Sequence, residues 1–513
     1  MMTPRLLPAL IVSLILLSAC TQPGPPPDPD LTPEDTTETL SEQPPASPDR
    51  SVIVHLFEWT WTDIAQECET FLGPAGYRAV QVSPPTENAV VEDPPRPWWE
   101  RYQPVTYRLD NRSGTRAQFA DMVSRCKAAG VDIYVDAILN HMTGVYAGAG
   151  TAGATFSEYD YPGLYTTADF HHCGLTPNDD IQDFNDRMQV QTCELVNLAD
   201  LDTGAEKVQA RLAEYLNDLI GLGVAGFRLD AARHVAADEL KAILDRLDGD
   251  PFIYQEVIDL AQQPTWALAY TPLGSVTEFR YGAALSDVFR NGPLTRLHGD
   301  GSIWQQIDFL PSDRALVFID NHDNQRGHGA GGSILTYKDN ERYTLAVVFM
   351  LAYPYGRPRV MSSYAFTESS QGPPADAASH IQRVHEGGTL HCFADAWICE
   401  HRRSPVAAMV AFHNVTDEAF GVANWWDNGN NQIAFGRGDR GFVVINRENG
   451  ALNRTLQTGL APGTYCNVLA GALADDGQGC TGPAVTVGAD GAATLAVEPM
   501  SALAIHVGAK VGG

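Results

Sequence analysis

The chain has 513 residues, of which 44% are hydrophobic and 19% charged, as is ordinary for a globular protein long enough to form several domains. Its formal net charge of −29 excludes nucleic acid as a partner, because a polyanion would be repelled. A neutral or cationic ligand is compatible with this charge. The simplest role of the charge is to keep the protein soluble.

The N-terminus has the pattern of an export signal, in which Arg5 precedes an apolar run at 6–17 that is short for a membrane span. The run ends in Leu-Ser-Ala-Cys, which resembles a bacterial lipobox, so we expect residues 1–19 to be removed and Cys20 to be lipidated. An ordinary signal peptide with a chance cysteine is the alternative. Residues 20–50 are rich in proline and acidic residues and too poor in large apolar ones to form a core, so they predict a tether. The protein is therefore expected to be exported, and either anchored to the cell envelope through Cys20 or secreted.

From residue 52 to residue 363, short apolar runs alternate with amphipathic helical segments such as 115–129 and 205–222. The expected strands cover 52–57, 78–83, 131–138, 224–230, 252–256, 275–279, 315–320 and 359–363. Repeated strand–helix units predict a parallel sheet, and eight of them predict a closed β/α barrel of the TIM type. The active site of such a barrel lies at the C-terminal ends of its strands.

Two regions depart from this alternation. Residues 140–203 are too long and too irregular for a simple loop, so they predict a domain inserted after the third strand. The barrel would then be formed by residues 51–139 and 204–420. Beyond residue 420, short β-like runs separated by Gly and Asn turns predict an antiparallel β domain over 421–513.

Three carboxylates stand at the ends of expected strands. Asp230 and Glu256 end the fourth and fifth strands, and Asp323 follows the seventh. A single carboxylate is more often a structural cap or half of an ion pair. Three that converge on one barrel mouth favour glycoside hydrolysis, which needs a protonated acid and an ionised nucleophile.

The segments around these carboxylates resemble the diagnostic segments of the α-amylase family of glycoside hydrolases. They read GFRLDAARH at 226–234, YQEV at 254–257 and FIDNHDNQ at 318–325, and VDIYVDAILNHM at 131–142 resembles a further one. The resemblance is nearest to the animal-type, chloride-dependent enzymes and their bacterial relatives, and it covers residues 51–513. It implies a monomeric enzyme that cuts internal α-1,4 bonds in starch, glycogen and maltooligosaccharides with retention of configuration.

The resemblance implies a role for each carboxylate. Asp230 would attack the anomeric carbon, about 5 Å from the acid. Glu256 would protonate the leaving oxygen and later activate water, and Asp323 would favour the distorted sugar ring. The implied substrate contacts are Trp98, Trp99, Tyr102, Gln103, His141, Arg228, Arg233, His234, His322 and His328. The adjacent tryptophans would form an exposed stacking platform, and the Gly-rich segment 327–332 a mobile lid.

Two ions and a disulfide pattern are implied in the same way. The calcium ligands would be the side chains of Asn140 and Asp200 and the main-chain carbonyls of Gln191 and His234. Chloride would bind Arg228, Asn321 and Arg359 and favour the protonated form of Glu256, whereas the alternative is that Arg359 simply pairs with a carboxylate. Without Cys20, eight cysteines remain, which suggests four disulfides in an exported chain. The resemblance pairs them as Cys68–Cys126, Cys173–Cys193, Cys392–Cys399 and Cys466–Cys480.

Two other functions stay open at this point. A non-catalytic, surface-anchored glucan-binding protein would usually lack one of the three carboxylates, and none is missing here. A related transglycosylating or exo-acting α-glucan enzyme would keep all three and would differ in its products.

Overall fold

The computed structural model describes residues 51–261, 265–329, 333–393 and 396–512. The expected export signal, Cys20 and the tether therefore lie outside the described residues. Within those ranges, no helix combines the length and the apolar character needed to span a membrane.

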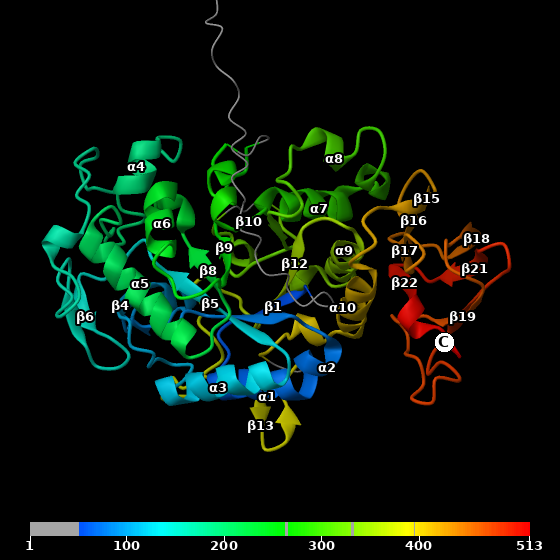
Figure 1. Cartoon of the computed structure of the whole chain (residues 1–513), viewed down its shortest axis with the longest axis horizontal. Coiled ribbons are helices and arrows are strands. Elements are labelled where there is room, and N and C mark those ends of the chain that lie inside the picture. The colour runs from blue at the N-terminus through cyan, green and yellow to red at the C-terminus, as the bar shows by residue number, and fades with distance from the viewer. Residues whose placement is uncertain (1–50, 262–264, 330–332, 394–395, 513) are drawn as a thin grey trace, which may run out of the picture. The chain divides into compact units, whose positions relative to one another are not determined.

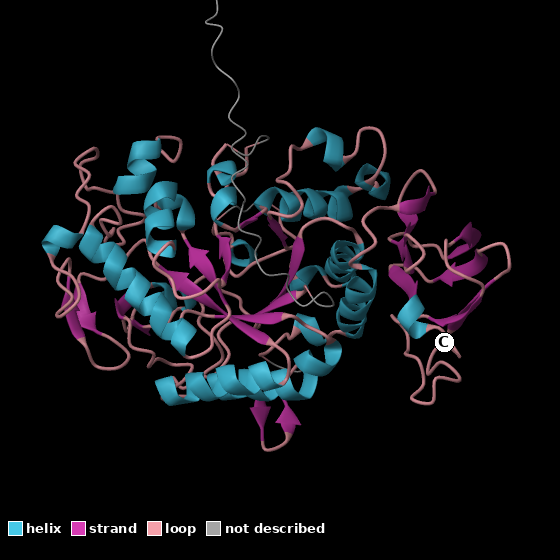
Figure 2. Cartoon of the chain, in the orientation of Figure 1, coloured by secondary structure: helices cyan, strands magenta, loops and turns pink. Residues whose placement is uncertain are grey.

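Eight parallel strands close into a barrel at the centre of the described chain (Figures 1 and 2). In chain order they are β1 (Ile53–Leu56), β2 (Ala79–Val82), β5 (Asp132–Ile138), β8 (Gly226–Asp230), β9 (Phe252–Gln255), β10 (Ser275–Thr277), β11 (Ala315–Val317) and β12 (Arg357–Ser362). Each strand pairs with the next one in this order, and β12 closes the barrel against β1. The predicted α/β barrel is confirmed, although β11 ends three residues before Asp320, and Phe279 begins a helix instead of ending β10.

Helices cover the outside of the barrel (Figure 2). They are α1 (Trp61–Glu67), α2 (Gly73–Ala75), α3 (Arg116–Ala128), α5 (Glu206–Gly221), α6 (Ala237–Leu244), α7 (Phe279–Asn291), α8 (Ile303–Gln306), α9 (Glu341–Ala352) and α10 (Ser404–Thr416). Helix α3 begins at a capping box in which Thr115 and Gln118 satisfy each other's backbone N–H groups. Helix α5 buries Val208, Leu212 and Leu219 on one face, the spacing that packs a helix against a sheet.

Between β5 and α5 the chain forms an irregular insertion. It contains β6 (Ala147–Ala149), β7 (Thr155–Ser157) and α4 (Arg187–Thr192). Its two ends lie together, because His141 and Asp200 pair in an isolated antiparallel bridge. The insertion also contacts the loop after β2, where β3 (Glu87–Asn88) pairs with β4 (Pro104–Thr106) and Ala89 bridges Gly150.

The C-terminal part is antiparallel. Its main sheet contains β15 (Ala423–Asp427), β16 (Gln432–Arg437), β17 (Gly441–Asn446) and β22 (Ser501–His506). The pairs β18–β21 (Leu452–Gln457, Ala492–Val497) and β19–β20 (Gly463–Cys466, Ala484–Val487) complete it, and a separate hairpin, β13–β14 (His385–Glu386, Thr389–Leu390), precedes α10. Buried Arg437 donates to the carbonyls of Ala352 and Thr416, which joins this sheet to the ends of α9 and α10.

Four disulfides are present in the described chain. They join Cys68 to Cys126, Cys173 to Cys193, Cys392 to Cys399 and Cys466 to Cys480. These are the pairs that the resemblance implied. The first joins the π-helical segment Cys68–Leu72, which directly continues α1, to α3, and the second lies inside the insertion.

Candidate active site

A cavity of about 840 Å³ opens at the C-terminal ends of the barrel strands, and Asp230, Glu256 and Asp323 all line it. Asp230 is the last residue of β8, and Glu256 directly follows the neighbouring strand β9. The backbone N–H of Ala231 donates to Glu256 Oε2 at 3.0 Å, which fixes one oxygen of that carboxylate. The barrel therefore brings together the three carboxylates that the sequence singled out.

Arg228 lies beneath the cavity and contacts three carboxylates. It is two residues before Asp230 on β8, so both side chains point to the same side of the strand. Its guanidinium group is 2.5 Å from Asp136, 2.7 Å from Asp230 and 2.5 Å from Glu256. Arg228 is 1% exposed and is not among the residues that line the cavity, where a sugar contact was expected. It pairs instead with Asp230 and Glu256, which line the cavity, and with Asp136, which does not.

Burial dominates the electrostatics of this cavity. It raises the pKa of Asp230 well above its usual range, while the Arg228 charge lowers it and the Glu256 charge raises it further. Burial and the Glu256 charge raise the pKa of Asp323 to about 7. Burial lowers the pKa of His322 well below its ordinary value, so its imidazole is neutral at pH 7. Neighbouring carboxyl groups with raised pKa values, beside a neutral imidazole, can exchange protons near neutral pH, which suits acid–base chemistry.

Trp98, Tyr102 and His322 form an aromatic wall of the cavity. The rings of Tyr102 and His322 stack with centroids 5.1 Å apart, and Trp98 meets His322 edge-on at 5.5 Å. Trp98 is only 5% exposed, so the prediction of an exposed stacking platform is wrong for this tryptophan; Tyr102 beside it is 8% exposed. A 3₁₀ turn over Trp98–Tyr102 folds them back onto the barrel, where Trp98 Nε1 donates to the carbonyl of Ser369. Trp99 is half-buried.

The remaining expected substrate contacts also reach the cavity. Its lining includes Trp99, Gln103, His141, Arg233, His234 and His328. The Gln103 side chain accepts backbone N–H groups from Gly144 and Val145 of the insertion at 3.0 and 3.2 Å. Burial lowers the pKa of His141 to about 4, and its Nε2 contacts the carbonyl of Tyr102 at 3.0 Å. Residues 330–332 of the expected lid lie outside the described residues.

Two of the four residues expected to bind calcium contact each other directly, and the other two lie on segments that contact each other. Asn140 Nδ2 donates to Asp200 Oδ1 at 3.1 Å. The His234 ring contacts the carbonyl of Val190 at 3.0 Å, one residue before Gln191. No group of three or more His, Cys, Asp and Glu side chains among the described residues suits a metal ion. The expected calcium ligands are one carboxylate, one side-chain amide and two main-chain carbonyls, so this site does not need three or more His, Cys, Asp or Glu side chains. All four ligands can offer oxygen atoms, which calcium prefers.

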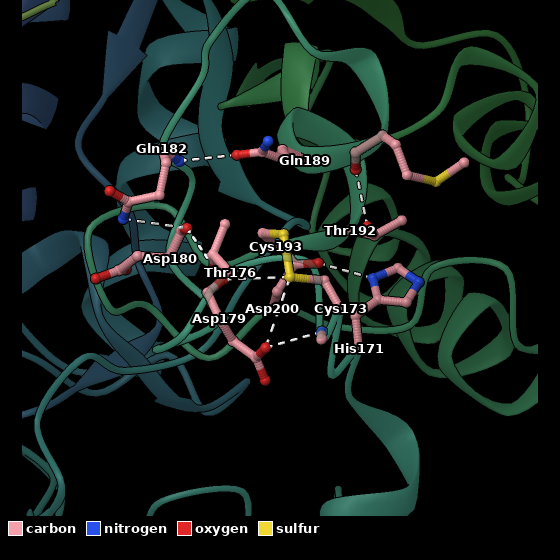
Figure 3. Close-up of a disulfide and its surroundings, with 12 residues drawn as sticks. His171, Cys173, Thr176, Asp179, Asp180, Gln182, Gln189, Thr192, Cys193 and Asp200 are labelled. Carbon is pink, nitrogen blue, oxygen red and sulfur yellow. Dashed lines mark hydrogen bonds and ion pairs between the residues drawn. A yellow bond between two sulfur atoms is a disulfide. The ribbon is translucent and has the colours of Figure 1, made fainter.

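Figure 3 shows the surroundings of Asp200 at the Cys173–Cys193 disulfide. His171 contacts Asp200 Oδ2 at 2.7 Å and lies two residues before Cys173. Burial raises the pKa of Asp200 to about 6, since this carboxylate is otherwise removed from water. A bound cation would offset the free-energy cost of burying the ionised carboxylate. The donor chemistry of this corner therefore fits the calcium ion that the resemblance implies.

Arg359 has the features of an anion ligand. Its Nη1 donates to Gln81 Oε1 at 2.7 Å, and its Nη2 is buried without a hydrogen-bond partner. In the described chain no carboxylate lies within ion-pair distance of Arg359. The alternative expectation, an ion pair between Arg359 and a carboxylate, is therefore not found. Gln81 also donates to Asp136, which contacts Arg228, so one network connects the two arginines. A buried guanidinium with an unused donor fits chloride.

Comparison with known proteins agrees with this geometry. Residues 75–263 match the catalytic domain of alpha amylases, and residues 423–508 match their C-terminal all-beta domain. The chain is 47% identical to the alpha-amylase of Pecten maximus, over 91% of this chain and 95% of that protein. It is 48% identical to the pancreatic alpha-amylase of Sus scrofa, over 90% and 95%. This chain belongs to the α-amylase family of glycoside hydrolases.

Solved structures of α-amylases share the fold. The α-amylase I of Eisenia fetida superposes with a TM-score of 0.83 at 45% identity, covering 90% of this chain and 98% of that one. A mutant of that enzyme, in complex with maltohexaose, matches equally well. The γ-CGTase of an alkalophilic Bacillus clarkii, at 19% identity and a TM-score of 0.61, shares the fold alone.

The sequence reasoning missed an apolar part of the α-amylase cavity. Phe184, Leu195, Val196 and Leu198 of the insertion line it, together with Ile258 after β9. Val196 is 74% exposed and Phe184 46%, which is unusual for apolar side chains and typical of a binding surface. The cluster of apolar residues at 195–198, inside a polar insertion, was a signal that could have identified part of this wall.

Proposed function

We propose that this member of the family is an endo-acting α-amylase that cleaves internal α-1,4 bonds of starch, glycogen and maltooligosaccharides by a retaining double displacement. One observation carries the proposal: Asp230, Glu256 and Asp323 line one cavity, and Arg228 contacts two of them from beneath. The relatives named above are α-amylases, and one solved relative is described with maltohexaose.

Asp230 is the proposed nucleophile. Its Oδ1 accepts a hydrogen bond from Arg228 Nη1 at 2.7 Å, and this charge opposes the rise in the pKa of Asp230 that burial causes, in favour of the ionised carboxylate that attack requires. Attack on the anomeric carbon forms a glycosyl–enzyme bond at Asp230 while the glycosidic bond breaks and its oxygen leaves with a proton from the acid. Water then hydrolyses the glycosyl–enzyme bond, which frees Asp230 and releases the sugar with its original configuration.

Glu256 is the proposed acid and base. Ala231 N–H and the Arg228 guanidinium hold its two oxygens, so the carboxyl group is fixed at the edge of the cavity. It would protonate the leaving oxygen and then remove a proton from the incoming water. Asp323, with its raised pKa, would bind sugar hydroxyls beside the His322 ring, whose Nε2 lies 3.4 Å from it.

The two ions are part of this proposal. Asn140, Gln191, Asp200 and His234 would hold calcium, which supplies a positive charge between the insertion and the turn after Asp230. Arg228, Asn321 and Arg359 would hold chloride, which supplies a negative charge that favours the protonated form of a neighbouring carboxyl. The orphaned Nη2 of Arg359 supports the second site, and the buried carboxylate of Asp200 supports the first.

The proposal also includes an export signal, a lipid anchor and the domain boundaries. The four disulfides are typical of exported proteins, which supports a signal over residues 1–19. Lipidation of Cys20, a tether over 20–50 and a monomeric state are proposed with it. The proposed domains are a barrel of 51–139 and 204–420, an insertion of 140–203 and a β domain of 421–513.

An iodine–starch assay with chromatography of the products tests this function. Wild type should lose the iodine colour early and release mixed short oligosaccharides. Glu256→Gln should lower kcat by about 10²- to 10⁴-fold, because it removes the acid, while the exposed control Glu368→Gln should match wild type. Maltose or glucose alone from the outset would favour the exo-acting alternative. Binding of starch without hydrolysis by wild type would favour the glucan-binding protein.

A further inference from the structure

Two arginine side chains lie against the indole ring of Trp266. The Cζ atoms of Arg187 and Arg233 are each 4.3 Å from the ring centroid. Arg187 begins α4 in the insertion (Figure 1), Arg233 belongs to the turn after β8, and Trp266 belongs to the loop after β9. These three residues, the Trp266 cluster, therefore join three separate segments around the mouth of the barrel.

Trp266 is fixed through both its backbone and its ring. Its N–H donates to Asp259 Oδ2 at 2.7 Å, and the same oxygen accepts the N–H of Ala267 at 3.2 Å. The indole packs against the small apolar core of the insertion that contains Ile181 and Val190. Trp266 thus holds the loop after β9 against the insertion.

Arg233 connects the cluster to the cavity wall. Its Nη1 donates to the carbonyl of Ile258 at 2.8 Å, and its Nη2 donates to the carbonyl of Phe184 at 2.6 Å. Both acceptor residues line the cavity, and Ile258 is only two residues beyond Glu256. The Phe184 side chain is 46% exposed and meets the His234 ring edge-on with centroids 6.4 Å apart, while the hydrogen bond from Arg233 positions its backbone.

We propose that the Trp266 cluster fixes the cavity wall beside Glu256 and thereby sets how well the enzyme holds the leaving-group half of a glucan chain. This rests on the function proposed above. A general acid lies within hydrogen-bond reach of the leaving oxygen, so the sugars on the leaving side pack against the wall next to Glu256. Phe184 and Ile258 offer those sugars an apolar surface. Arg187 and Trp266 act through these two residues, as positioning residues.

The test compares two substrates of the variants Trp266→Leu and Arg187→Gln. End-labelled maltoheptaose places several sugars on the leaving side, and an aryl α-maltotrioside places only its aryl group there. We expect KM for maltoheptaose to rise by about two- to fivefold, the factor for one exposed cation–π contact, and its cleavage to shift toward shorter leaving groups. The aryl substrate should keep its KM. Trp266→Phe, which keeps an aromatic face, should restore most of the wild-type pattern.

The chain offers a matched control. Arg454 places its Cζ atom 4.9 Å from the Trp426 ring in the C-terminal β domain, so Arg454→Gln removes the same kind of contact elsewhere. It should leave both substrates unchanged.

An unchanged maltoheptaose pattern in Trp266→Leu would overturn the proposal. So would an equal fall in kcat on both substrates with constant KM, because loss of folded enzyme has that effect. A wild type that cleaves neither substrate would overturn the proposed function, and this proposal with it.

Discussion

Asp320 and Glu400 form a buried carboxyl network behind the active site. Asp320 is 1% exposed and Glu400 0%, and no arginine, lysine or histidine of the described chain lies within ion-pair distance of either. Asp320 accepts hydrogen bonds from Tyr343 Oη at 2.9 Å and from Gln325 Nε2 at 2.6 Å. Gln325 also contacts Ser363, whose N–H donates to Glu400 Oε2 at 2.7 Å. We predict that this network makes the stability of the fold fall as the pH rises.

The sign and size follow from the two pKa shifts. Burial and then the Glu400 charge raise the pKa of Asp320 to about 8, and burial raises the pKa of Glu400. The folded protein therefore keeps protons that the unfolded chain releases above about pH 4. The contribution of these groups to the free energy of unfolding is fully present below pH 4. It declines between about pH 4 and pH 8, by at most about 1.4 kcal/mol per pH unit for each proton.

The perturbation is Glu400→Gln, which keeps the shape of the side chain and removes one titrating group. Over pH 5 to 8 the stability of the variant relative to wild type should increase with pH, by at most about 1.4 kcal/mol per pH unit. The unfolding entropy of a chain this long is on the order of 1 kcal/mol/K, so each kcal/mol of gain raises Tm by about 1 °C. Thermal unfolding by circular dichroism at pH 5, 6, 7 and 8, in constant calcium, measures it.

Glu368→Gln, in an exposed loop, is the control and should shift Tm equally little at each pH. If the Tm difference between Glu400→Gln and wild type is the same at all four pH values, Glu400 does not bind a proton in the folded state over this range. That result would refute the reasoning.

Three further perturbations test other parts of the structure. Arg359→Gln should abolish activation by chloride, and equal wild-type rates in chloride and acetate at matched ionic strength would contradict this. Glu67→Gln should lower stability by about 3–5 kcal/mol, because buried Glu67 is the counter-charge of Arg402 and also contacts the rings of His385 and His401; a melting curve measures it. Replacing Cys173 and Cys193 by serine should weaken calcium binding in a chelator titration, since this disulfide joins segments that flank expected ligands; unchanged affinity would count against that site.

The barrel and the three carboxylates could be predicted from the sequence because each depends on local patterns. Buried parallel strands are short apolar runs, and the residue at the end of such a run faces the barrel mouth. Asp230 ends β8 as predicted, and Glu256 follows β9 by one residue. The boundaries were less predictable, as at β11, because apolar character continues beyond the last ladder pairing of a strand.

The apolar wall and the Trp266 cluster could not be predicted in this way. Phe184 and Trp266 lie in irregular segments without hydrophobic periodicity, and Arg233 contacts both only because the insertion folds back onto the loop after β9. The exposure of Trp98 was misjudged for a related reason. The tryptophan pair is followed by the charged residues Glu100 and Arg101, which suggested exposure, but the neighbours of Trp98 in space are the rings of Tyr102 and His322.

The charge balance beneath the cavity connects the two arginines to catalysis. Arg228 contacts three carboxylates, whereas Arg359 donates to the Gln81 amide oxygen, lies over the Phe318 ring and keeps a buried donor without a hydrogen-bond partner. Arg228 also holds the carboxyl group of Glu256, the proposed acid, at 2.5 Å. This carboxyl group must be free to donate to the leaving oxygen when substrate binds. An anion shared by the two arginines would satisfy the unused donor and weaken this hold on Glu256, so the same residue pair explains both why Arg359 is buried and why chloride would matter.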